Sequence, residues 1–363
     1  MRVLIVTGAS GGHIFPALSF QDALKKKHNE IDTLLVLPKR NIKKQTLNIS
    51  YKVKYLSISP IELHLDFKNF VAIFNFFKGF FESLFIIFEF SPDIVVGFGS
   101  LTCVPLLIIA WVMRIKTLIH EQNVIPGRAN RLLARFTDKI AISFAQTQDY
   151  LEINKTKIVL TGNPIRQELK MIDRFKALTF FGFDDNKFTI LIMGGSLGSQ
   201  KINTSFQGAI SVITDKSRFQ VIHITGDRDY RLLDNSYKDL KLKFKLFSFL
   251  EDMQYAYSIC DLAVSRAGAT TIAELINFAL PAIIIPYPFA YKHQLSNAKV
   301  LERRGCAIII DDNELSAGFL KQSIESLTSN PDRLKNMRLG YEGFPKVCAN
   351  ESLVNEVMSL RSE

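Results

Sequence analysis

The stretch RVLIVTGASGGHIFPALS, residues 2–19, decides the fold. It starts with an apolar run at 2–7, passes through three glycines, and continues into a segment with helical spacing from about Ile14 to Lys27. A buried strand that turns through glycines into a helix is the opening unit of a doubly wound α/β domain. The glycines let the backbone approach a ligand closely, and the helix N-terminus favours an anion there.

Short apolar runs alternate with helical stretches along the rest of the chain, which is typical of parallel sheets. The further strands expected in the first half are 32–37, 93–98, 116–120, 138–143 and 157–162. Those expected in the second half are 188–195, 219–226, 243–249, 261–266, 281–288 and 306–312. We therefore expect two doubly wound domains, 1–163 and 164–344, that face each other across a cleft. The last helix, within 345–363, is expected to pack back on the first domain.

Composition places the chain among globular proteins with a basic half. Its 363 residues are 47% hydrophobic and 22% charged, which excludes a disordered or fibrous protein. Lys and Arg total 45 against 35 Asp and Glu, a formal charge of +10. Residues 1–166 hold 21 basic and 12 acidic side chains, a net of +9, so nearly all the excess lies there. A basic half favours an anionic partner: nucleic acid, anionic lipid or a phosphorylated substrate.

Neither targeting nor a membrane span is expected from the sequence. The four cysteines lie far apart without metal-binding spacing, which favours a reduced, cytosolic setting. The first strand begins at Arg2 and leaves no room for a signal peptide. Residues 94–113 are uncharged and long enough to span a bilayer, but glycines and Pro105 interrupt them. Residues 67–90 hold ten of the 29 Phe, and four charged residues interrupt this stretch as well.

Polar and glycine-rich motifs follow the expected strand ends of the first half. His13 sits at the helix start, where a base or a phosphate ligand would act; a capping histidine without chemistry is the alternative. GFGSLTCVP at 97–105 is a second strand–glycine–helix turn. HEQN at 120–123 groups four polar side chains beside apolar strands, which is costly unless they are satisfied or used. Three arginines follow on one helical face, which is basic or simply solvated: Arg128, Arg131 and Arg135.

The second half repeats the pattern with groups suited to a nucleotide and a sugar. MGGSLGSQKIN at 193–203 reads as a second phosphate cradle between a strand and a helix. Glu274 lies about one and a half turns into a later helix and suits two ribose hydroxyls; an ordinary surface residue is the alternative. Gln294 and Asn297 follow the next strand and suit sugar hydroxyls.

Several other site types are missing from the sequence. The first glycine turn is not GxGxxG, and no acidic residue ends the second strand, which argues against a dinucleotide. No pair of carboxylates has glycosidase spacing, no Walker lysine is present, and no DxD-type pair follows a mid-domain strand. We therefore expect no metal and no cofactor.

Taken together, the motifs resemble the MurG family of bacterial peptidoglycan glycosyltransferases over nearly the whole chain. The matching segments, in order and spacing, are TGASGGHIFPAL, HEQN, TGNPIR, GGSLGSQKIN, SRAGATTIAEL and PYPFAYKHQLSNA. The resemblance implies two Rossmann-like domains of the GT-B type. It implies an inverting transfer of GlcNAc from UDP-GlcNAc to the 4-hydroxyl of undecaprenyl-diphospho-MurNAc-pentapeptide (lipid I), which makes lipid II for peptidoglycan synthesis.

The resemblance also assigns the second domain to the donor, UDP-GlcNAc. The family's donor-binding positions fall on Arg166, Ser196, Leu250, Glu274, Gln294 and Asn297. The first two would meet the diphosphate, Glu274 the ribose, and the last two the sugar. Leu250 falls where the backbone reads the uracil edge. Two departures from the family's usual residues lie here: Leu197 stands for Gln and Ser199 for Ala.

The first domain is assigned by the resemblance to the acceptor. Gly11, Gly12 and His13 match the acceptor-side loop, while Glu121 and Asn123 match the other wall of the cleft. We expect His13 to act as the base, because an unperturbed pKa of ~6.5 suits neutral pH. Alternatively, His13 binds the acceptor diphosphate with Glu121 as helper. Two further departures lie in 97–105, where Ser100 and Leu101 stand for Gly and Tyr.

The Phe-rich segment is expected to hold the protein at a membrane. Its helical stripe comprises Leu63, Phe67, Phe70, Phe74, Phe77, Phe81, Leu84 and Phe88, which Phe76, Phe80, Ile86 and Ile87 widen beyond an ordinary core face. We expect this surplus to lie in the interface, with Lys68 and Lys78 near anionic headgroups. A buried pair of core helices is the alternative.

The expected partners are therefore UDP-GlcNAc, lipid I and the anionic cytoplasmic face of the bacterial membrane, to which the protein binds peripherally. Nucleic acid is not expected, because recognition motifs are missing and the positive charges do not line one stripe. Another GT-B enzyme, acting on diacylglycerol or an antibiotic, is the competing hypothesis.

Overall fold

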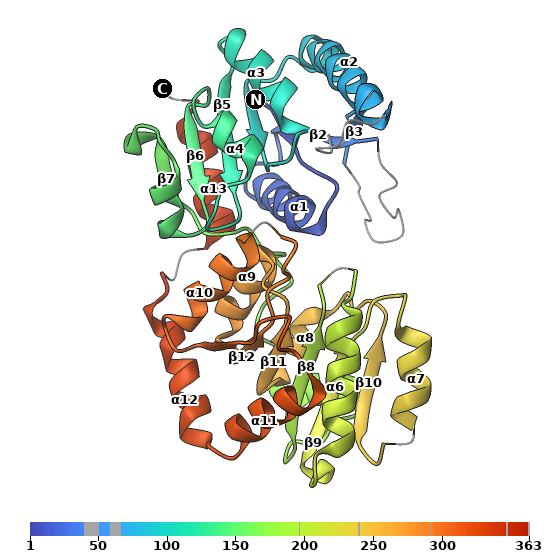
Figure 1. Ribbon diagram of the computed structural model, residues 1–363. Helices are drawn as coiled ribbons and strands as arrows, with labels where there is room; N and C mark the ends of the chain where they lie inside the picture. The colour runs from blue at the N-terminus through green and yellow to red at the C-terminus, as the bar shows by residue number, and fades with distance from the viewer. Residues whose placement is uncertain are drawn as a thin grey trace. The chain divides into compact units, whose positions relative to one another are not determined.

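The computed structural model describes residues 1–39, 51–58, 67–195, 197–238, 240–290, 292–345 and 348–361, with only the backbone for 67–73. The chain forms two compact units, Met1–Gln167 with Val347–Glu363, and Glu168–Lys346 (Figure 1). Each unit is built around one parallel sheet, and the doubly wound architecture expected from the sequence is confirmed in both.

The sheet of the first unit has seven parallel strands in the order β3-β2-β1-β4-β5-β6-β7. Its strands are β1 Arg2–Val6, β2 Asp32–Pro38, β3 Val53–Leu56, β4 Ile94–Gly97, β5 Lys116–Glu121, β6 Lys139–Ile142 and β7 Ile158–Leu160. The order reverses between β1 and β4, which leaves a crevice beyond the carboxyl ends of these two strands. The edge strand β3 was not expected from the sequence.

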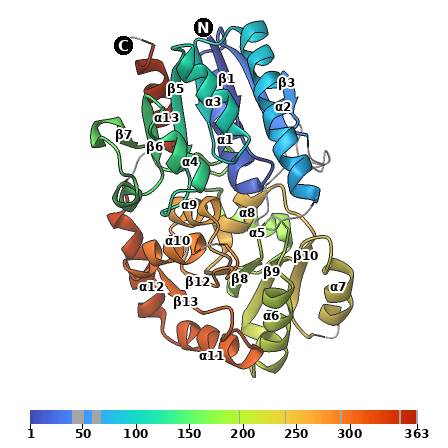
Figure 2. The same ribbon diagram turned by 45° about the horizontal axis from the view of Figure 1, so that its top comes forward.

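Alternate side chains of these strands supply two cores, one on each face of the sheet. Val3 and Ile5 pack against α1, Gly11–Lys27, and against the C-terminal helix α13, Ala349–Ser359. Leu4 and Val6 belong to the core on the opposite face. That face is covered by α2 Phe67–Phe90, α3 Cys103–Val112 and α4 Arg128–Leu133, which can be followed in Figure 2. Because α13 contacts α1, the last helix completes the first unit.

The second unit repeats this plan with six parallel strands in the order β10-β9-β8-β11-β12-β13. These are β8 Phe188–Met193, β9 Phe219–Ile224, β10 Lys243–Phe247, β11 Leu262–Ser265, β12 Ala282–Ile284 and β13 Ala307–Ile309. The helices are α5 Arg174–Phe181, α6 Gln200–Val212, α7 Tyr230–Lys238, α8 Met253–Ile259, α9 Ala269–Phe278, α10 His293–Glu302, α11 Ala317–Thr328 and α12 Pro331–Leu339. The reversal lies between β8 and β11, so the second crevice opens beyond those strands.

Helix α2 matches the expected outward face only in part. Of the predicted stripe, Phe74, Phe77, Phe81 and Phe88 are 66%, 61%, 68% and 63% exposed; Phe85, which the stripe did not include, is 72% exposed. Ile86 and Ile87, expected in the membrane-facing surplus, are buried instead, so that part of the prediction is wrong. Leu63 and the side chains of Phe67, Lys68 and Phe70 lie outside the described residues.

Small residues explain this orientation of α2. Gly79 lies so close to Ile58 that a Cβ on it would meet the Ile58 Cγ1 at 2.7 Å. Ser83, one turn later, is fully buried and donates its hydroxyl to the Gly79 carbonyl. The helix approaches the sheet through its smallest residues, and the bulky phenylalanines remain outside. In the described part of the chain, no helix is both long and apolar enough to cross a membrane.

The turn after β4 contains a strained residue. Ser100 has a φ of +78°, in the left-handed region that favours glycine. It lies next to Gly99, whose φ is +81°. The serine is therefore held in place by the surrounding packing at a cost in stability.

We predict that Ser100→Gly raises the free energy of unfolding by about 1 kcal/mol, because it relieves the left-handed strain. For a unit of this size, the thermal midpoint should rise by about 2–4 °C. Calorimetry checks this, with Ser329→Gly as the control at a serine whose φ is −83°. Equal effects of the two substitutions would contradict the strain argument.

The second unit contains a fully buried neutral histidine. His223 hydrogen-bonds to the Tyr237 hydroxyl at 2.8 Å and to the Asn203 Oδ1 at 3.0 Å. Burial lowers the pKa of His223 from 6.5 to about 3. Below pH 6.5 the unfolded chain therefore takes up a proton that the folded unit does not bind, so stability is lost as the pH falls from 6.5 toward 3.

We predict that this residue contributes a slope approaching about 1.4 kcal/mol per pH unit in that window. His223→Gln should flatten the acid side of the stability profile, measured by denaturant unfolding between pH 7 and 4. The partly exposed His28 supplies the control, because His28→Gln should leave the slope unchanged. Identical slopes for wild type and His223→Gln would refute the prediction.

Candidate functional site

The crevice of the first unit is built around the His13 imidazole. His13 lies in the first turn of α1, directly after the glycine loop that follows β1. A Cβ on Gly99 would come within 3.1 Å of the His13 ring, and one on Gly8 within 3.2 Å. The two glycine turns predicted from the sequence therefore meet at this ring, and a side chain at either glycine would crowd it.

A chain of hydrogen bonds connects His13 to the segment that follows the edge strand β7. The His13 Nδ1 lies 3.0 Å from the Gln122 Oε1. The Gln122 Nε2 lies 3.1 Å from the His120 Nδ1, and the His120 Nε2 lies 2.9 Å from the Gly162 carbonyl oxygen. Gln122 is 1% exposed and His120 is fully buried. Gln122 and His120 were noted in the sequence only as part of a polar group without individual roles.

His120 is neutral throughout the physiological pH range. The pKa of His120 is lowered from 6.5 to about 4, chiefly by burial; the hydrogen bond to Gly162 opposes this shift and the nearby His13 adds to it. The ring of His120 packs against that of Phe98, with centroids 5.4 Å apart. The His120 ring at the end of β5 is thus held in place, and both of its nitrogens have hydrogen-bond partners.

The Glu121 carboxylate holds the loop after β5. Its Oε1 accepts from the Asn123 backbone N–H at 2.9 Å and from the Asn123 amide at 3.2 Å. Its Oε2 accepts from the Gly127 N–H at 3.0 Å and from the Asn130 amide at 2.8 Å. With four donors on two oxygens and 2% exposure, Glu121 fixes the loop that leads into α4.

The start of α1 offers backbone donors beside His13. Ser10 is the N-cap, but its side chain makes no capping hydrogen bond, and the first turn has no acidic residue. Gly12 has open space on its Cβ side. The amides of Gly11 and Gly12 and the helix dipole therefore suit an anion next to the imidazole.

The crevice of the second unit also has a glycine loop between a strand and a helix. The loop from Gly194 to Ser199 joins β8 to α6, and a Cβ on Gly194 would meet the Ser199 nitrogen at 2.2 Å. Arg266 braces this loop by donating to the Ser199 hydroxyl at 2.9 Å and to the Asp312 Oδ1 at 2.5 Å. Ser196 lies outside the described residues.

Arg266 and Asp312 form a nearly buried ion pair that sequence reasoning did not identify. Their side chains are 9% and 12% exposed. Desolvation opposes the charge on Asp312, but hydrogen bonds from Arg266 and Lys201 outweigh it and lower the pKa of Asp312. Nothing in the local sequence around Arg266 reveals a partner 46 residues away.

Glu274 is oriented by a tyrosine on a neighbouring helix. The Tyr257 hydroxyl on α8 donates to the Glu274 Oε2 at 2.7 Å. Leu250 is buried in the loop that leads into α8. The tyrosine was not expected from the sequence, because its partner lies on a different helix.

Gln294 and Asn297 both hold the turn before α9. The Gln294 Oε1 accepts from the N–H groups of Ala267 and Tyr287, at 3.1 and 2.9 Å. Asn297 donates to the Ala267 carbonyl at 3.1 Å and is fully buried. Their bonds position the Gly268 N-cap of α9, which has no side-chain cap.

Arg166 lies in the first unit, which extends to Gln167. The sequence had placed the domain boundary after residue 163 and Arg166 in the second domain. Among the residues that the structure describes, no three His, Cys, Asp or Glu side chains gather in a way that could hold a metal ion. The residues predicted to bind the donor are thus distributed over both units, whereas those predicted for the acceptor all lie in the first unit.

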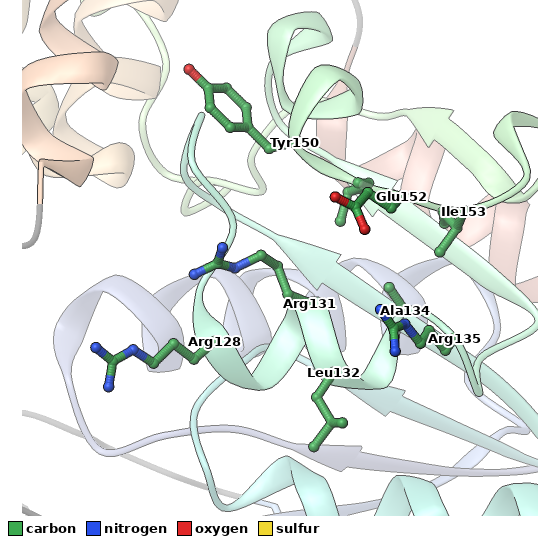
Figure 3. A pocket seen from close by; sticks show the side chains of 9 residues that line it. Arg128, Arg131, Leu132, Ala134, Arg135, Tyr150, Glu152 and Ile153 are labelled. Carbon is green, nitrogen blue, oxygen red and sulfur yellow. The ribbon is translucent and has the colours of Figure 1, made fainter.

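A separate hollow of about 390 Å³ lies on the first unit beside α4. It is lined by Arg128, Arg131, Leu132, Ala134, Arg135, Tyr150, Leu151, Glu152 and Ile153. Figure 3 shows Arg128 and Arg131 on α4 and Arg135 in the turn after it, with Glu152 near Arg135. The basic face expected at i, i+3 and i+7 therefore borders a concave surface.

Family models match most of the chain. The glycosyltransferase family 28 N-terminal domain matches residues 3–142, and its C-terminal domain matches residues 189–350. These two matches correspond to the sheets of the first and second units.

Among solved structures, MurG of Acinetobacter baumannii superposes with a TM-score of 0.77 at 24% identity, covering 99% of this chain and 100% of that one. A Neisseria meningitidis UDP-GlcNAc 2-epimerase bound to UDP-GlcNAc superposes with a TM-score of 0.69 at 16% identity, covering 99% and 100%. These similarities confirm the expected GT-B fold.

Sequence relatives resemble the chain from end to end. A UDP-N-acetylglucosamine--N-acetylmuramyl-(pentapeptide) pyrophosphoryl-undecaprenol N-acetylglucosamine transferase of Thermodesulfovibrio yellowstonii is 36% identical over 99% of both chains. An enzyme of the same name from Desulforamulus reducens is 35% identical over 93% of this chain and 92% of its own. The chain therefore belongs to the family of these N-acetylglucosamine transferases, the MurG family.

Proposed function

We propose that this protein transfers GlcNAc from UDP-GlcNAc to the 4-hydroxyl of undecaprenyl-diphospho-MurNAc-pentapeptide, with inversion at the anomeric carbon. The observation that carries the proposal is identity of about one third to enzymes of that name over both units. The reaction belongs to peptidoglycan synthesis. Both crevices offer the backbone donors that phosphorylated substrates need.

The chemistry is a single displacement. The acceptor oxygen forms a bond to the anomeric carbon as the bond from that carbon to the diphosphate oxygen breaks, and UDP leaves with the electron pair. Negative charge grows on the diphosphate, where Arg166 and the free amides at the start of α9 stabilise it. Gln294 and Asn297 support this step by hydrogen-bonding to the backbone of Ala267, in the turn that precedes α9.

His13 takes the proton of the acceptor hydroxyl. It lies at the crevice, next to backbone amides that suit the acceptor diphosphate, and its Nδ1 is already engaged by Gln122. Glu121 serves this step by fixing the loop, because its oxygens already accept four hydrogen bonds. In the donor unit, Glu274 would receive the ribose hydroxyls in the orientation that Tyr257 sets.

The outward face of α2 and its neighbours docks on the membrane. Beyond the α2 phenylalanines, Trp111 at the end of α3 is 49% exposed and contacts Phe136, and Leu132 on α4 is 47% exposed. Helix α3 contacts both α2 and α4, so these groups share one side of the unit. The arginine-lined hollow on α4 would hold anionic headgroups beside this apolar face.

The activity is tested by UDP release from UDP-GlcNAc with and without lipid I. We expect release only with the muramoyl lipid, and a diacylglycerol acceptor should give none. Removal of the base should cost about 10²- to 10⁴-fold in turnover, so His13→Ala should lose that factor while its affinity for UDP-GlcNAc stays unchanged. His28→Ala, at a partly exposed histidine of the same unit, is the control.

The outcomes separate the proposals. Release with diacylglycerol but not lipid I would overturn the assigned acceptor. Turnover of His13→Ala within a few fold of wild type would show that His13 is not the base, without changing the assigned reaction.

We predict that Phe77, Phe81, Phe85 and Phe88 changed together to Ser abolish binding to vesicles that contain anionic lipid, because each exposed ring buries apolar area in the interface. Vesicle sedimentation measures this. The matched control is Phe175→Ser with Phe319→Ser, at rings 79% and 44% exposed on the second unit. Unchanged binding by the folded quadruple variant would refute the docking face.

A further inference from the structure

We infer that Gln122 sets the tautomer of His13, placing the hydrogen on Nδ1 and leaving the Nε2 lone pair for the substrate. Gln122 and His120 are then positioning residues for the base. The catalytic part of this inference rests on the proposed role of His13, whereas the tautomer itself does not.

The orientation of the Gln122 amide is forced by its surroundings. One terminal atom of the side chain lies 3.3 Å from the Phe98 carbonyl oxygen and 3.1 Å from that of His120. Only an NH2 group is stable between two carbonyl oxygens, because an oxygen there would face two acceptors in a site that is 1% exposed. The atom that faces His13 is therefore Oε1.

The orientation of the Gln122 amide determines which nitrogen of His13 carries the hydrogen. Gln122 Oε1 has no hydrogen, so the His13 Nδ1, 3.0 Å away, must donate to it. A neutral His13 consequently carries its hydrogen on Nδ1, and its basic lone pair lies on Nε2. An unconstrained histidine in water favours the opposite tautomer, so this contact selects the less common form.

His120 secures the amide from the other side. Its Nε2 donates to the Gly162 carbonyl oxygen at 2.9 Å, so its Nδ1 accepts from Gln122 Nε2 at 3.1 Å. Burial keeps the ring neutral, with a pKa of about 4. A protonated His120 would present a donor to Gln122, which would favour the rotated amide and the wrong tautomer of His13.

An amide suits this position better than a carboxylate does. When His13 accepts the substrate proton on Nε2, its Nδ1–H keeps the same bond to Gln122, so the ring need not move. A carboxylate would orient the ring equally well, but its negative charge would favour the protonated imidazole, which cannot take a further proton. Gln122 orients the base without adding that charge.

The test is ¹⁵N NMR of the histidine rings in the full-length protein at pH 8, where the two tautomers give distinct nitrogen shifts. His13→Ala identifies the His13 signals. We expect a protonated Nδ1 in wild type and a shift toward protonated Nε2 in Gln122→Met. A wild-type spectrum with protonated Nε2 overturns the inference. Because this measurement uses the wild-type protein, it does not depend on whether a variant folds.

Gln21→Met is the matched control, because Gln21 is also a fully buried glutamine of this unit, bonded to Thr33 at 2.9 Å. It should leave the His13 tautomer unchanged. In serine proteases a wrong histidine tautomer costs about 10⁴ in turnover. Here we expect Gln122→Met to lower kcat by at least about 10-fold with the KM for UDP-GlcNAc unchanged.

The two proposals fail in different ways. If wild-type His13 carries the Nδ1 hydrogen but His13→Ala keeps its turnover, the base assignment falls and the tautomer inference stands. If His13→Ala is inactive and wild-type His13 carries the Nε2 hydrogen, the base stands and the role of Gln122 falls.

Discussion

The site in the first unit depends on the close approach of the His13 ring to the backbone at Gly8 and Gly99. A methyl group at either position would lie within 3.2 Å of the imidazole. Because the ring reaches this place, its Nδ1 meets Gln122, and Gln122 in turn meets three acceptors from β5 and the end of β4. The glycines thus serve the histidine directly, in addition to freeing amides for an anion.

The same parallel fold builds two different crevices. In the first unit, neutral polar groups with almost no exposure hold a histidine. In the second, a nearly buried ion pair between Arg266 and Asp312 braces the glycine loop through the Ser199 hydroxyl. Removing one partner of such a pair typically costs about 3–5 kcal/mol, since it leaves an uncompensated charge. Neutral groups suit proton transfer, whereas the charged brace suits a loop that binds an anion.

The sequence predicted the strands other than β3 and the glycine turns, because these depend on local patterns. Prediction from the sequence failed for features that depend on contacts between residues far apart in the chain. The strand at Val53–Leu56 is short and lies at an edge, so its apolar signal is weak. The face of α2 follows from Gly79 against Ile58, which no periodicity reveals. The roles of Gln122, Tyr257 and Arg266 depend on partners from other elements, which the local sequence does not reveal. Gln294 and Asn297 were singled out for sugar hydroxyls, but in the structure they hydrogen-bond to backbone groups.

The most direct test of the central claim is a crystal structure of the protein with a soluble lipid I analogue that retains the muramoyl 4-hydroxyl and the diphosphate. The account predicts the His13 Nε2 at hydrogen-bond distance, about 2.6–3.2 Å, from that hydroxyl, with Gln122 still bound to Nδ1. A structure in which the imidazole binds the diphosphate and the 4-hydroxyl lies beyond its reach would contradict the account.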